Sequence, residues 1–210
     1  MGEYMGNVDA LANATRENRC MNTSFSDWMW ETGIIQFGYF VDGDAVVPVR
    51  FCPEYLPAYP RLLSEVAKLM LAQLDVSEID HVIAPPNSVP LGVACSLQSG
   101  FSLAYSRGRG EAAVYDLVGS YNSGHMSALI VNCIEDFAPI EKFVIDARIV
   151  GLETLWIVSL LEMRPINQLA KIPIRSVFRL VDIAQELVAA GRLPEGQSQA
   201  VLNWISERYE

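Results

Sequence analysis

The sequence predicts a single α/β domain built on a mainly parallel central sheet flanked by helices. Two apolar runs, 128–134 and 154–161, show almost none of the polar alternation of a strand with one wet face. Strands of parallel sheets are buried on both faces and give such continuous runs. Segments with helical spacing alternate with the expected strands, and there is no internal repeat. With 210 residues, 51% of them hydrophobic and 19% charged, the chain is long enough for one substantial core.

Composition and charge exclude several classes of partner. The net charge is -10, and lysines and arginines form no large cluster, which disfavours nucleic acid or an anionic membrane as a partner. The four cysteines form no C-x-x-C pair, so neither a disulfide framework nor a cysteine metal site is expected. The sequence has no apolar signal-peptide core and no run of membrane-spanning length. We therefore expect a cytoplasmic protein.

The chain divides into three expected parts: a flexible polar tail over 1–22, the domain over 23–195, and a C-terminal helix over 196–210 that packs on the domain. At the start of the domain, Ser24 or Ser26 can cap a short helix that Gly33 ends. The expected elements that follow are strands over 34–40, 46–51, 79–84, 101–105, 128–134, 154–161 and 171–178, and helices over 62–74, 90–99, 141–150, 181–190 and 198–209. The strand over 46–51 is expected at an edge, because Pro48 cannot donate to a ladder.

Candidate site residues follow three of the expected strands. In open α/β sheets, ligands gather beyond the carboxyl ends of central strands. The candidate ligand-binding residues are Pro86, Asn87, Ser88, Arg107, Arg109, Asn132, Cys133, Asp136, Phe137 and Ala138. The candidate catalytic residues are Glu135 and Asp136, and no set of metal ligands is expected. His81 falls inside a strand and is expected to be a packed or hydrogen-bonded histidine.

The segment 128–138 resembles the signature of type I phosphoribosyltransferases, most closely the orotate phosphoribosyltransferase branch. That signature has four apolar residues, two aspartates that face the ribose of phosphoribosyl pyrophosphate (PRPP), two variable residues, and a Thr-Thr-Gly that cradles the 5′-phosphate at a helix start. In one alignment, Asn132 and Cys133 replace the aspartates and 136–138 replaces Thr-Thr-Gly. A shift of one residue would instead place Glu135 and Asp136 on the threonines.

Other parts of the chain, from Ser24 to Leu193, resemble the family in order and local pattern. The segment 31–38 is similar to the family's opening, a helix ending in Glu-Thr-Gly before a strand that contains Phe-Gly. The segment 79–92 resembles the pyrophosphate-binding loop, with Asn87 and Ser88 replacing its two glycines. Arg107 matches an arginine that opens the family's mobile hood, whereas the following lysine is replaced by glycine. The resemblance implies the type I phosphoribosyltransferase fold.

The departures from the signature lead to three hypotheses about function. A carboxylate about 5 Å from a bound phosphate, at an effective dielectric near 20, costs about 3 kcal/mol, or a hundredfold in affinity. The first hypothesis is therefore a non-catalytic protein that binds a nucleotide or another anion in a regulatory role. The second is an active transferase that uses Mg²⁺ with PRPP and stabilises positive charge through Glu135 or Asp136. The third is a structural subunit whose site is filled by side chains such as Phe137. The resemblance also implies a homodimer.

Overall fold

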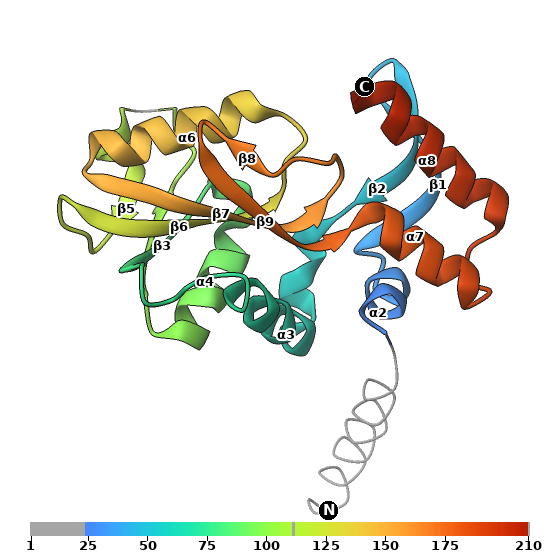
Figure 1. Ribbon diagram of the computed structural model, residues 1–210, viewed down its shortest axis with the longest axis horizontal. Helices are drawn as coiled ribbons and strands as arrows, with labels where there is room; N and C mark the ends of the chain where they lie inside the picture. Colours follow the sequence, from blue (N-terminus) through green and yellow to red (C-terminus); the bar gives the residue numbers. More distant parts are fainter. Residues whose placement is uncertain (1–23, 111, 210) are drawn as a thin grey trace, which may run out of the picture.

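The computed structural model describes residues 24–110 and 112–209, and its centre is a seven-stranded sheet with the order β5-β4-β3-β6-β7-β9-β8 (Figure 1). The five inner strands are parallel, and β5 and β8 are antiparallel edges. The strands are β3 (His81–Ala84), β4 (Ser102–Ser106), β5 (Leu117–Gly119), β6 (His125–Cys133), β7 (Leu152–Glu162), β8 (Gln168–Leu169) and β9 (Ile172–Arg179). The expected fold class, a mainly parallel α/β sheet, is confirmed.

The continuous apolar runs occupy the middle of this sheet because both of its faces are covered. Ile130 and Val158 are buried in the core on one face, whereas Leu129 and Ile157 are buried in a second core on the other. Helices α3 (Pro60–Leu71) and α4 (Val89–Ser99) cover the first face. Helix α6 (Phe137–Ile149) covers the second (Figure 1).

A hairpin and three helices extend the first core beyond the sheet. They are β1 (Ile35–Asp42), β2 (Ala45–Phe51), α2 (Phe25–Glu31), α7 (Leu180–Ala189) and α8 (Glu195–Tyr209). Helix α8 lies against α7 and β2 (Figure 1). Phe37 and Val49 of the hairpin are buried in the same cluster as Ile130 of the sheet, so hairpin and sheet share one core.

Several boundaries differ from the sequence expectation. Of the two expected caps of α2, the structure selects Ser24, whose hydroxyl accepts from the Asp27 amide, and other elements begin elsewhere than expected. Helix α6 begins at Phe137 instead of 141, because Asp136 supplies a cap and proline is tolerated in a first turn. Helix α8 begins at Glu195, and the short elements α5 (Ala113–Asp116), η1 (Pro53–Ala58), η2 (Pro86–Ser88) and β8 were not expected.

The structure does not describe the N-terminal segment, and the helices that it does describe are not of the membrane-spanning kind. The tail expected over 1–22 lies outside the residues that the structure describes. Among the described residues, no helix combines the length and the apolar character that crossing a membrane requires.

Candidate functional site

The loops that follow β3 and β4 touch at the carboxyl edge of the sheet. Gly108, after β4, has φ +70°, a left-handed conformation that favours glycine. A Cβ atom at this position would lie 2.8 Å from Cγ of Pro86, in the loop after β3. Glycine at 108 therefore permits both the turn and the close approach, and the structure brings the expected diphosphate loop beside the arginine loop, 107–110.

Asn132, at the end of β6, is hydrogen-bonded to the loop after β3. Its amide N–H donates to Oγ of Ser88 at 3.0 Å, and its Nδ2 donates to the carbonyl of Asn87 at 2.6 Å. Ser88 is fully buried and Asn132 is 5% exposed. Buried polar groups need such partners. These residues hold the ends of β3 and β6 together, and their hydrogen bonds go to the protein itself.

Asp116 fixes the arginine loop against α5. Its carboxylate accepts from the hydroxyl of Ser106 and, at 3.0 Å, from the amide of Arg109. These hydrogen bonds, the one from Ser106 first, lower the pKa of the Asp116 carboxyl below its usual value. The Arg107 guanidinium donates to the carbonyl of Tyr115. The loop thus has a defined shape, and the Arg107 side chain is held against α5.

The start of α6 is occupied by the carboxylate of Asp136. Asp136 is the N-cap residue, and its Oδ1 accepts from the Ala138 amide at 3.1 Å. The first turn of a helix exposes four unpaired amides. Here Ala138 uses one, and Pro139 has no N–H, so the turn offers a phosphate fewer donors and a nearby negative charge.

Phe137 packs beneath an arginine from the neighbouring strand end. The guanidinium carbon of Arg164, just after β7, lies 4.1 Å from the centre of the Phe137 ring. Phe137 is half-buried against the second core. Arg164 was not among the candidate residues, although its position immediately after a central strand is the signal that could have found it.

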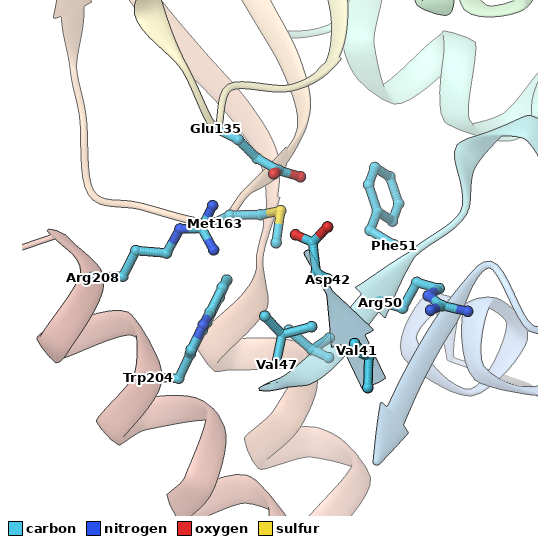
Figure 2. A pocket seen from close by; sticks show the side chains of 10 residues that line it. Val41, Asp42, Val47, Arg50, Phe51, Glu135, Met163, Trp204 and Arg208 are labelled. Carbon is cyan, nitrogen blue, oxygen red and sulfur yellow. The ribbon is translucent and has the colours of Figure 1, made fainter. Parts of the chain in front are cut away.

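Cys133 packs against the first core, next to Glu135. Burial, followed by the charge of Glu135, raises the pKa of the Cys133 thiol to about 12, which excludes a thiolate nucleophile near neutral pH. The thiol lies 3.7 Å from Oε1 of Glu135. Glu135 itself lines a pocket of about 210 Å³ between the β1–β2 hairpin, the end of β6 and α8 (Figure 2). The two candidate acids therefore have different surroundings, since Asp136 caps α6.

The described residues do not fit a resident divalent ion. Within them, no three His, Cys, Asp or Glu side chains gather in a metal-binding arrangement. His81, at the opposite edge of the sheet, is 5% exposed and its Nε2 donates to the Ser120 carbonyl at 2.6 Å. It is the hydrogen-bonded core histidine that the sequence suggested.

Comparisons with known proteins connect this arrangement to one fold. No family model matches the chain, and no curated protein matches its sequence. The UMP synthase of Leishmania donovani aligns with a TM-score of 0.77 and 19% identity over 87% of this chain, which spans 42% of that protein's length. The orotate phosphoribosyltransferase of Francisella tularensis aligns with a TM-score of 0.66 and 16% identity over 89% of this chain and 99% of its own. The orotate phosphoribosyltransferase of Aeropyrum pernix aligns with a TM-score of 0.66 and 18% identity over 79% of this chain and 99% of its own.

These similarities establish the phosphoribosyltransferase-like α/β fold. Identities below 20% establish no activity, because fold and chemistry are separate properties. The chemistry of this chain depends on the residues of its own loops.

Proposed function

We propose that this chain is a phosphoribosyltransferase-like protein that binds a nucleotide or another anion without catalysing transfer, in a regulatory or accessory role. Its fold and the order of its loops support a ligand site at the carboxyl edge of the sheet. The main observation against phosphoribosyl transfer is the position of the Asp136 carboxylate, which accepts a hydrogen bond from the Ala138 amide at 3.1 Å.

The cap competes with a phosphate for the same amides. In the family that the sequence resembles, this turn holds the 5′-phosphate of PRPP. A carboxylate fixed about 5 Å from that phosphate costs about 3 kcal/mol at an effective dielectric near 20. Asn132 replaces an aspartate in one alignment, and its Nδ2 donates a hydrogen bond to the Asn87 carbonyl instead of to a ligand. Both features weaken binding of the ribose donor.

The arginine loop supports retained binding of an anion. Arg107 and Arg109 flank Gly108, which touches Pro86 beside the ends of β3 and β4. Guanidinium groups suit phosphate or carboxylate through paired hydrogen bonds. A ligand held chiefly by this loop does not need the amides at the start of α6.

An active transferase is the second candidate, and one observation favours it. Glu135 is exposed at the end of β6 and caps no helix, so its carboxylate can stabilise positive charge that develops on a bound sugar. The described residues do not supply a cluster for Mg²⁺.

The proposal includes a homodimer and a cytoplasmic location. Leu97, on the outer side of α4, is 81% exposed, and Val93 one turn earlier is 42% exposed. A second copy could cover this pair. Light scattering of the purified protein measures its molar mass in solution, and the mass of a single chain would refute the dimer.

Thermal shift with PRPP, orotate and finished nucleotides, each with and without magnesium, tests the ligand class. A ligand at a hundred times its dissociation constant stabilises the protein by about 2.7 kcal/mol. Stabilisation by a nucleotide but not by PRPP supports the proposal. Conversion of PRPP and a free base to a nucleotide would refute it.

Asp136→Ser tests the specific role of the cap. Serine keeps a helix cap but removes the charge, so we expect affinity for PRPP to rise by up to about a hundredfold. Glu141→Gln, one turn into α6, makes the same change in net charge without touching the cap. An equal response of the two variants would contradict the argument.

A further inference from the structure

A second pocket, of about 330 Å³, lies where β7 and β9 end, between the loop after β7 and the helices α7 and α8. Glu162 is the last residue of β7 and Arg179 is the last residue of β9. The two are partners in the parallel ladder, and both line the pocket. We call this space the strand-end pocket. No residue of the arginine loop lines it.

The carboxylate of Glu162 has no hydrogen-bond partner in the described part of the chain, and no ion pair reaches it there. The residue is half-buried. Burial raises the pKa of the Glu162 carboxyl, the charge of Arg179 partly opposes this, and the charge of Asp182 adds to it. A carboxylate that has lost water without gaining a donor from the protein is a group that a ligand can stabilise.

The two arginines and two acids that line the strand-end pocket balance in charge. Asp182 accepts from Nε and Nη2 of Arg179 at 2.6 and 2.8 Å, so this pair neutralises itself. The positive charge of Arg164 offsets the negative charge of Glu162. A neutral ligand therefore suits this pocket better than a cation or an anion does.

The rest of the lining offers apolar surface and hydrogen-bond donors. Met163, Val181 and Ile205 supply the apolar surface. Helix α7 begins at Leu180 without a side-chain cap, so amide groups of its first turn add to the donors of Arg164. An acceptor, donors and apolar surface together suit a flat neutral ring whose edge carries N–H groups next to a carbonyl.

We infer that the strand-end pocket binds the guanine ring of a nucleotide or nucleoside, with its N1–H and 2-amino groups donating to the Glu162 carboxylate and its ring against the apolar lining. Guanine presents these two donors side by side, which matches the two oxygens of a carboxylate. Hypoxanthine lacks the amino group, and adenine presents an acceptor at N1. The inference rests on the proposed function and deepens it, because it names the base of the proposed nucleotide.

Guanosine, inosine and adenosine test recognition of the base in the absence of a phosphate. Ligand-observed saturation-transfer NMR and titration calorimetry measure their binding to the full chain. Guanosine should bind about tenfold more tightly than inosine, which lacks one donor, and adenosine should bind least tightly. Equal affinities for the three nucleosides, or no binding of guanosine, would overturn the inference. Equal thermal stabilisation by GMP and AMP would also overturn it, while supporting the proposed function.

Glu162→Gln locates the site, and Glu207→Gln is its matched control. Glu207 is an exposed acid on α8 that does not line the pocket. Glu162→Gln should abolish the preference for guanosine over inosine, because glutamine offers only one acceptor atom, whereas Glu207→Gln should keep it. A preference that survives in Glu162→Gln would overturn the inference.

The pH dependence separates the role of the carboxylate from a structural role of Glu162. Only the ionised carboxylate accepts both hydrogen bonds, so guanosine should bind wild type more weakly in acid, whereas its binding to Glu162→Gln should be independent of pH. The same pH profile in both proteins would overturn the inference. Asp136→Ser should leave guanosine binding unchanged, so the two proposals fail separately.

Discussion

Replacing Asn132 by aspartate restores the acid that one alignment with phosphoribosyltransferases places there, and the structure predicts that the fold resists it. Nδ2 of Asn132 donates to the Asn87 carbonyl at 2.6 Å, and the residue is 5% exposed. An aspartate carboxylate would present an acceptor to an acceptor in a buried position. Loss of the hydrogen bond and burial of an unpaired charge together cost about 3 kcal/mol. For a chain of this size that is roughly 6–12 °C in Tm.

The pH dependence of the Asn132→Asp effect gives a sharper test than the size of the stability loss. A protonated aspartic acid can donate to the Asn87 carbonyl, so folding raises the pKa of the new carboxyl above its unfolded value of about 3.9. The folded state then binds more protons than the unfolded state, and stability relative to wild type falls as the pH rises above about 4. Urea unfolding of both proteins from pH 4 to pH 8 measures this difference.

Asn203→Asp is the control for the same chemical change on the surface. Asn203 is exposed on α8, and its side-chain oxygen accepts from Gln199 at 2.9 Å, which a carboxylate can also do. We expect a change within about 0.5 kcal/mol. If Asn132→Asp were as stable as wild type at pH 7, or if acid failed to narrow the gap, the hydrogen bond to Asn87 would not be what holds β6 to the neighbouring loop.

Three further variants or reactions test the loops. Asp116→Asn should lower the free energy of unfolding by about 1 kcal/mol at neutral pH and speed amide hydrogen exchange in 107–110. Because folding lowers the pKa of the Asp116 carboxyl, wild type loses this extra stability as the pH falls below about 4. A stability difference that stayed constant with pH would contradict the reasoning. Gly108→Ala should destabilise more than Gly110→Ala in denaturant titrations, since both have similar positive φ but only the first would meet Pro86, at 2.8 Å. With its pKa raised to about 12, Cys133 should react with iodoacetamide at pH 8 more than about a thousandfold more slowly than an exposed thiol, as peptide mass spectrometry can measure.

The strands that build the fold could be predicted because their signal is local. The apolar runs in β6 and β7 reflect burial on both faces, which any segment in that position must satisfy. The start of α6 was missed for an equally local reason. The expected helix began at 141, whereas Asp136 as a cap followed by Pro139 in the first turn is itself a pattern of a helix start.

The site was only partly predictable because its contacts join distant segments. Strand ends pointed to the loops that contain Asn87, Arg107 and Asn132, and the structure shows contacts between these loops. The placement of Arg164 on Phe137 depends on a side chain from the next strand. The meeting of Asp42 with Glu135 depends on where the hairpin packs, and neither local period nor spacing encodes that position.

The hydrogen bonds within the loops also limit how tightly a ligand can bind there. Ser88, Asn87 and Asp136 already pair with groups of the protein, so a ligand that uses the same atoms must break one hydrogen bond for each that it forms. Such exchange contributes little net free energy, whereas leaving a buried partner unpaired costs about 1–3 kcal/mol. The Arg107 guanidinium already donates to the Tyr115 carbonyl, but an arginine has five N–H donors and can bind an anion without breaking that hydrogen bond. Binding strength at the carboxyl edge should therefore depend on the arginines far more than on the loop amides.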